Sequence, residues 1–121
     1  MLILLIDDDP DIRLLAGVVL EQAGHQVSFA DSASAGIAAA ETDCDVVLLD
    51  YRLGDRSGLD VLPALLAARP VRPVVFLTGA EDPEVVRSLS DAGAAGVILK
   101  PFDPESLAAR VEAIARAHRG A

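Results

Sequence analysis

The chain has little of several residue types, and each shortage narrows what it can be. It contains no tryptophan, one tyrosine and three phenylalanines, so its core must be built from aliphatic side chains. Cys44 is the only cysteine, which excludes an intramolecular disulfide and favours a reducing cytoplasm. The apolar run from Leu2 to Ile6 is far too short for a membrane span or a signal segment. We therefore expect a cytoplasmic protein without membrane contacts.

Positive charge is also scarce. The formal net charge is -9 at pH 7, and the basic residues form no cluster along the chain. Direct binding of nucleic acid is not expected, because it needs cations that replace the counterions along the phosphates. Protein partners are favoured instead. With 121 residues, the chain has room for one domain, 1–121, and we expect no output domain.

What the chain does contain is a regular alternation of short apolar runs and helical patterns. The apolar runs are typical of buried parallel strands and cover residues 1–6, 26–30, 45–50, 73–77 and 96–99. Helical spacing, Asp-Pro pairs at three helix starts and glycines at several helix ends predict helices that follow these strands, over residues 10–23, 32–41, 58–69, 82–92 and from 103 onward. Pro63 is expected near the amino end of its helix, where a missing donor costs least.

Five strands that alternate with helices predict an α/β domain with a parallel sheet covered on both faces. At the carboxyl edge of such a sheet, polar residues follow four of the strands: Asp7 and Asp8, Asp50, Thr78 and Lys100. In open α/β sheets this edge is where ligands bind. Three carboxylates in one crevice repel one another, and a magnesium ion, which prefers oxygen ligands, is the simplest compensation.

Each of these residues also has an ordinary structural interpretation. Asp50 could end a strand or cap a helix, and Thr78 could be a turn hydroxyl. Lys100 could be a surface side chain, but it is the only lysine of the chain and it follows a predicted strand. The set as a whole, rather than any single residue, indicates a functional site.

In this order and spacing, Asp7-Asp8, Asp50, Thr78 and Lys100-Pro101 resemble the receiver domain of two-component response regulators. Gly58, eight residues after Asp50, and Phe102, directly after Pro101, fit the same pattern. The resemblance covers essentially the whole chain. It implies a single (βα)5 flavodoxin-like, doubly wound domain with a five-stranded parallel sheet in the order 2-1-3-4-5.

The resemblance also implies a role for each site residue. Asp50 would be the phosphoacceptor, taking a phosphoryl group from a phosphohistidine on a sensor histidine kinase or phosphotransfer protein. Magnesium would be bound directly by Asp8 and Asp50, through water by Asp7, and by the backbone carbonyl of Arg52. The chain would catalyse its own phosphorylation and dephosphorylation without being a turnover enzyme.

Thr78 and Lys100 would contact phosphoryl oxygens, and the Lys100-Pro101 peptide bond would be cis. A downstream protein would dock on the face formed by the fourth helix, fifth strand and fifth helix, and a phosphorylation-dependent homodimer is a further form that the resemblance allows. Exposed residues expected on this face are Arg87, Ser90, Asp91, Arg110 and Glu112.

Four positions depart from the usual pattern of the family. Val97 stands where an aromatic switch residue is usual, so the aromatic part of the switch cannot operate as it usually does. Gly54 replaces a common proline, which predicts a looser loop. Arg52 and Ala80 stand at positions that tune hydrolysis of the acyl phosphate. Because Ala80 has no group to orient a water molecule, we expect a long-lived phosphorylated form.

Two other functions remain open at this point. A haloacid-dehalogenase-like phosphatase also uses a strand-end aspartate with magnesium and lysine, but it needs an acid two residues later, where this chain has Arg52. A receiver fold used as a constitutive interaction module would not need the intact set of site residues. The chain could act as a stand-alone regulator, a phosphorelay intermediate or the receiver part of a longer protein.

Overall fold

Strands and helices alternate along the part of the chain that the computed structural model describes, residues 1–54, 56–79 and 83–120. The elements are β1 (Leu2–Ile6), α1 (Pro10–Gln22), β2 (Gln26–Ala30), α2 (Ala33–Ala39), β3 (Val46–Asp50), β4 (Arg52–Leu53), β5 (Arg56–Ser57), α3 (Gly58–Ala68), β6 (Val74–Thr78), α4 (Pro83–Asp91), β7 (Gly96–Leu99) and α5 (Leu107–Gly120). The short strands β4 and β5 pair antiparallel directly after β3. The apolar pattern of the sequence does not predict this hairpin.

The other five strands form one parallel sheet in the order β2-β1-β3-β6-β7. Counted without the small hairpin, this is the expected order 2-1-3-4-5, so the predicted fold is confirmed. All residues of the central strand β3 are buried, and Asp50 at its end is in register with Leu77 of β6. Strand order reverses between β1 and β3, and this arrangement opens a crevice at their carboxyl ends.

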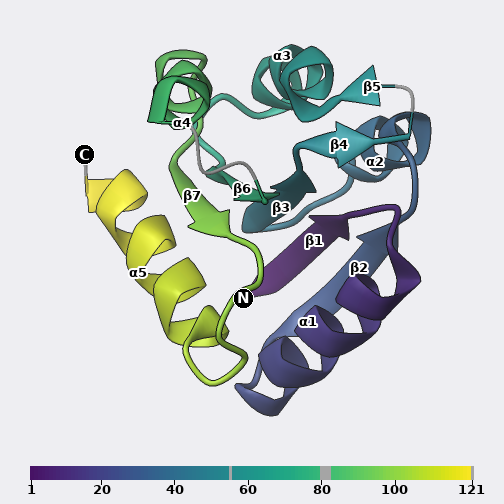
Figure 1. The fold of residues 1–121 in the computed structure, drawn as a ribbon, viewed down its shortest axis with the longest axis vertical. Helices are drawn as coiled ribbons and strands as arrows, with labels where there is room; N and C mark the ends of the chain where they lie inside the picture. Colours follow the sequence, from purple (N-terminus) through teal and green to yellow (C-terminus); the bar gives the residue numbers. More distant parts are fainter. Residues whose placement is uncertain (55, 80–82, 121) are drawn as a thin grey trace.

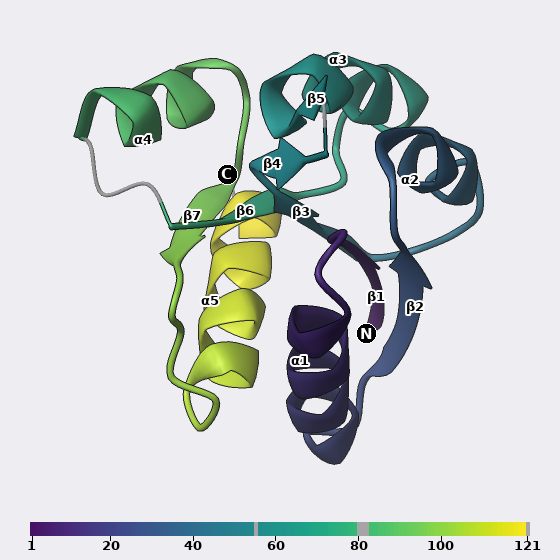
Figure 2. The same cartoon turned by 45° about the vertical axis from the view of Figure 1, so that its right-hand side comes forward.

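Helices cover both faces of the sheet (Figures 1 and 2): α1 and α5 lie on one face, and α2, α3 and α4 lie on the other. Alternate residues of a strand point to opposite faces. In β1, Leu5 packs in the cluster that includes Leu20 of α1, and Leu4 packs in the cluster that includes Leu62 of α3. The central strands are thus enclosed between two apolar clusters.

Several predicted helix boundaries are confirmed, among them the start of α1 and the ends of α1 and α4. The Asp9 side chain accepts a hydrogen bond from the backbone N–H of Asp11 and caps α1, whose first residue is Pro10. Gly24 and Gly93, just after α1 and α4, adopt φ angles of 95° and 111°. No helix within the described ranges combines the length and the apolar character needed to cross a lipid bilayer.

Two predicted boundaries are wrong. Pro63 lies inside α3, beyond its first turn, rather than near the amino end. A capping box between Ser57 and Asp60 satisfies donors at the start of this helix and supports the turn that precedes the proline. α5 begins at Leu107, because Asp103 closes a separate turn by accepting hydrogen bonds from the backbone N–H groups of Glu105 and Ser106. The predicted cap Asp82 lies outside the described residues.

Gly58, the first residue of α3, offers a test of how tightly the site end of β3 is packed. A Cβ atom on Gly58 would lie 2.6 Å from the carbonyl oxygen of Asp50 and 2.7 Å from Cε1 of Phe76. Because that carbonyl belongs to a buried strand, we expect Gly58→Ala to lower the free energy of unfolding by about 1–3 kcal/mol in urea denaturation. Gly79→Ala is the control, since its Cβ would meet nothing within 4 Å. Equal losses in both variants would contradict the prediction.

Candidate functional site

The residues predicted to form a site do meet at the carboxyl edge of the sheet. Asp7 and Asp8 follow β1, Asp50 ends β3, Thr78 ends β6 and Lys100 follows β7. A hollow of about 490 Å³ at this edge is lined by Asp8, Asp9, Asp50, Tyr51, Arg52, Gly54, Thr78, Gly79 and Lys100. Its size is in the range of small-ligand sites.

Three carboxylates form the acidic part of this site. Asp7, Asp8 and Asp50 each offer an oxygen atom, and these atoms lie within 4.8 Å of one another. Asp7 is fully buried and Asp50 is 8% exposed, whereas Asp8 is open to solvent. The arrangement places one buried and one accessible carboxylate beside the residue predicted to be phosphorylated.

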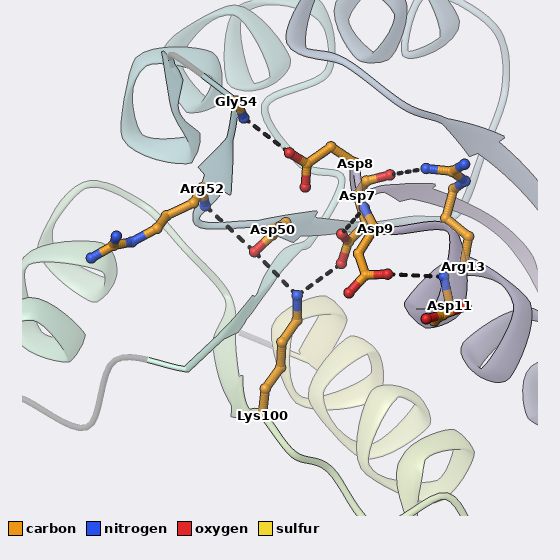
Figure 3. Close-up of polar contacts among 9 residues, drawn as sticks. All are labelled: Asp7, Asp8, Asp9, Asp11, Arg13, Asp50, Arg52, Gly54 and Lys100. Carbon is orange, nitrogen blue, oxygen red and sulfur yellow. Dashed lines mark hydrogen bonds and ion pairs between the residues drawn. The ribbon is translucent and has the colours of Figure 1, made fainter.

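Lys100 provides the compensating positive charge (Figure 3). Its Nζ atom lies 2.9 Å from Oδ2 of Asp7 and 3.3 Å from Oδ1 of Asp50, so the ammonium bridges the two buried acids. One ammonium does not balance three carboxylates, and the site keeps a negative excess that a cation would neutralise.

The surroundings of Asp50 raise the pKa of its carboxyl group. Burial, followed by the neighbouring charge of Asp7, raises the pKa of Asp50 to about 6, although Lys100 and the backbone N–H of Arg52 oppose the change. Burial lowers the pKa of Lys100, but the hydrogen bond and charge of Asp7, together with Asp50, outweigh it and the net shift is upward. Near neutral pH, Asp50 is therefore mostly ionised and Lys100 is protonated.

Two contacts that hold the acids are not predicted from the sequence. The Gly54 N–H donates to Oδ2 of Asp8 over 3.1 Å, and Nη1 of Arg13 donates to the carbonyl oxygen of Asp7 over 2.7 Å (Figure 3). Gly54 has a φ of 64°, which proline cannot adopt, and proline has no N–H to donate. Glycine in place of the usual proline predicts a looser loop at residue 54, and the structure shows that Gly54 also orients a carboxylate. Arg13 lies in the first turns of α1, close to Asp7 along the chain, and this proximity is the only feature of the sequence that points to their contact.

The remaining predicted positions surround this centre. Thr78 is 2% exposed, and its carbonyl accepts a hydrogen bond of 2.7 Å from the Lys100 N–H. Val97 is half-buried and packs against the core cluster on the α2–α4 face. The Lys100-Pro101 peptide bond is cis. Ala80 lies outside the described residues.

The residues expected on the partner face do not all share it. Arg87, Ser90 and Asp91 of α4 and Arg110 of α5 are exposed. Glu112 is not: it is half-buried, and its carboxylate lies 3.7 Å from Nε2 of the largely buried His25, which precedes β2. Glu112 points toward the amino-terminal part of the sheet, so its assignment to the exposed face is wrong.

The donor set fits a magnesium ion. Two or more carboxylate oxygens within reach of one another, with room for water in the adjoining hollow, match the oxygen coordination that magnesium prefers. Two residues after Asp50, the structure has the exposed side chain of Arg52 rather than a carboxylic acid. The acid that a haloacid-dehalogenase-like phosphatase needs at this position is absent.

Comparisons with known proteins agree with this geometry. The family model for the response regulator receiver domain matches residues 3–112. The chain is 36% identical over 115 residues to the probable transcriptional regulatory protein TcrX of Mycobacterium tuberculosis, covering 94% of this chain and 49% of that protein. It is 39% identical over 113 residues to the DNA-binding response regulator MtrA of Mycolicibacterium smegmatis, covering 92% and 49%. The chain thus spans about half the length of these relatives.

Solved structures share the fold as well. A CheY-like response regulator receiver domain protein from Methanospirillum hungatei superposes with a TM-score of 0.89 at 28% identity, covering 98% of this chain and 96% of that one. The chemotaxis protein CheY4 of Vibrio cholerae gives a TM-score of 0.87 at 27% identity, covering 93% and 97%.

The raised pKa of Asp50 predicts how stability changes with pH in metal-free protein. Because the folded-state pKa of about 6 exceeds the ordinary value of 3.8, ionisation of Asp50 destabilises the fold, and this cost is absent below about pH 4 and complete above about pH 6. With chelator present, we expect Asp50→Asn to be more stable than the parent by about 2–3 kcal/mol at pH 7.5. Urea denaturation at a series of pH values measures the difference, which should shrink as pH falls toward 4. A difference that does not depend on pH would contradict this origin.

Proposed function

We propose, from the premise that the chain belongs to the response regulator receiver domain family, that Asp50 accepts a phosphoryl group from a phosphohistidine. The observation that carries the proposal is the geometry of the carboxyl edge. A largely buried carboxylate, two further acids and the only lysine of the chain converge on one hollow. This is what phosphoryl transfer to an aspartate requires.

In the proposed reaction, a carboxylate oxygen of Asp50 attacks the phosphorus atom of the donor. A P–O bond forms, the P–N bond to the donor imidazole breaks, and the imidazole nitrogen takes up a proton after it leaves. The work left to the protein is to align the reactants and to neutralise charge on the phosphoryl oxygens. No general base is needed, because Asp50 is ionised at neutral pH.

The surrounding residues supply alignment and charge. Lys100 already lies 3.3 Å from Asp50, and its ammonium would pair with a phosphoryl oxygen, while the Thr78 hydroxyl would donate a hydrogen bond to another. Asp8, Asp50 and the carbonyl of Arg52 would hold magnesium directly, with Asp7 acting through water. When bound, the magnesium ion would neutralise charge on the phosphoryl oxygens. Gly54 keeps Asp8 in place for this role.

The phosphorylated form would act by changing protein contacts. We propose that a sensor histidine kinase or phosphotransfer protein in the cytoplasm is the donor, and that a downstream protein docks on the face formed by α4, β7 and α5. A phosphorylation-dependent homodimer through the same face is a related form. Residues 1–121 would work as one receiver unit that modifies only itself, and the net charge of -9 disfavours direct DNA contact by this unit.

Acetyl phosphate tests the proposal without a known kinase. We expect intact-mass measurement to detect a single phosphoryl adduct after incubation with acetyl phosphate and magnesium. The adduct should disappear in Asp50→Asn and in samples with chelator, whereas Asp103→Asn, which changes an exposed acid outside the site, should keep it. An adduct that persists in Asp50→Asn would show another acceptor. Absence of any adduct, together with absence of magnesium binding, would favour a constitutive interaction module.

The lifetime of the adduct tests the interpretation of Ala80. We expect phosphate to be lost slowly, because an alanine side chain cannot orient the attacking water molecule. Ala80→Glu should shorten the half-life of the adduct several-fold, as followed by intact mass after removal of acetyl phosphate. Ala80→Ser, with a shorter side chain, serves as the comparison. Rapid loss from the parent protein, unchanged in Ala80→Glu, would contradict the interpretation.

A further inference from the structure

A second hollow lies at the opposite edge of the sheet, near the amino ends of β3 and β6. Its volume is about 600 Å³, and the described residues that line it are Cys44, Asp45, Arg69, Pro70, Val71, Arg72, Pro73 and His118. They come from the segment before β3, the connection between α3 and β6, and the end of α5. Asp50 and Thr78 end these same two strands at the other edge, so the two hollows are separated by the length of the strands.

Arg72 is the residue in this hollow that needs an explanation. It is 4% exposed, although arginine is almost never fully buried without a partner. Its Nη1 atom donates to the carbonyl oxygen of Thr42 over 3.5 Å and to Sγ of Cys44 over 3.2 Å. Its Nε and Nη2 atoms have no hydrogen-bond partner. Among the described residues, no acid forms an ion pair with it.

A buried guanidinium with two unused donors is costly, because these groups have lost water and gained no acceptor. If Arg72 served only to tie Thr42 and Cys44 to the loop before β6, Nη1 alone would suffice. The edge that bears Nε and Nη2 is the edge that binds carboxylate or phosphate oxygens in paired fashion. A single oxyanion placed at this edge would satisfy both donors at once.

The neighbours of Arg72 favour an anion and do not compete with it. Arg69 adds a second positive charge and pairs with Asp43, whose side chain is 80% exposed, so this contact can exchange readily. Burial raises the pKa of the Cys44 thiol, which stays neutral despite the nearby arginines. Asp45 is the one acid in the lining, and its Oδ2 atom already accepts a hydrogen bond from the Leu2 N–H.

We propose that this hollow binds a small oxyanion, the carboxylate or phosphate group of a small molecule, through the guanidinium of Arg72. The volume suits a small-molecule ligand, with Pro70, Val71 and Pro73 as apolar contacts. Nε and Nη2 are covered in this structure, so binding as proposed requires the guanidinium to turn toward the hollow. Binding here does not use any residue of the phosphorylation site, so either proposal can fail without the other.

Thermal unfolding tests the site in chelator, with inorganic phosphate and acetate as probes and sodium chloride at matched ionic strength as the reference. A ligand that binds only the folded state raises Tm, because it adds a stabilisation of RT ln(1 + [L]/Kd), while phosphate also stabilises proteins by general exclusion. We expect at least one probe to raise the Tm of the parent protein and of Arg56→Gln, an exposed control, and to lose most of this shift in Arg72→Gln. Equal shifts in all three proteins would mean an adventitious ion only.

Resonances of arginine side chains give a second measurement that needs no variant. In ¹⁵N-labelled parent protein, titration with either probe should move the Nε–H resonance of Arg72 along a saturable curve, with a smaller change at Arg56. Saturation with phosphate alone would identify a phosphoryl ligand, and saturation with acetate would identify a carboxylate. A resonance that does not move, or that moves linearly with salt, would overturn the proposal even if Arg72→Gln fails to fold.

Discussion

The ammonium of Lys100, held between Asp7 and Asp50, is the contact on which the site depends. Three parallel strands carry their ends to one edge, and two of the carboxylates there are buried. Without a cation between them, their repulsion would destabilise the connection between β1 and α1, which carries Asp7, and the end of β3, which carries Asp50. Lys100 relieves this repulsion only in part, because burial and Asp7 still raise the pKa of Asp50. Lys100 thus offsets enough repulsion for the carboxylates to be buried together, and the negative charge that remains would favour binding of a second cation.

The strands were predictable because their burial leaves a direct mark on the sequence. β3 and β6 begin within one residue of the predicted positions, since runs of large apolar side chains fit a covered sheet and every residue of these strands is buried. Boundaries that depend on side-chain capping were less predictable. Asp103-Pro104 has the same pattern as Asp9-Pro10, but Asp103 closes a separate turn and α5 starts later. Sequence alone does not distinguish a cap of a helix from a cap of the turn before it.

The site residues were predictable for a geometric reason, because the ends of parallel strands meet whatever their distance along the chain. The contacts that orient them were not. Gly54 reaches Asp8 only because the β4–β5 hairpin folds back over the edge, and this hairpin leaves no apolar pattern. Glu112 was misplaced because helical spacing does not reveal which flank of α5 meets His25. Which two side chains contact each other depends on how the elements pack, and the spacing of residues along the sequence does not carry this information.

The burial of the strands would also limit how the proposed phosphorylation is transmitted. β3 and β6 are buried at every residue, and close-packed strands of this kind resist displacement. β7 is different: only Ile98 is fully buried, Val97 is half-buried against the cluster that includes Leu89 of α4, and Lys100 follows the strand directly. A phosphoryl group that draws Lys100 away from Asp7 would therefore act first on β7. With valine in place of an aromatic residue, the change would reach α4 through packing of this strand rather than through rotation of a large ring.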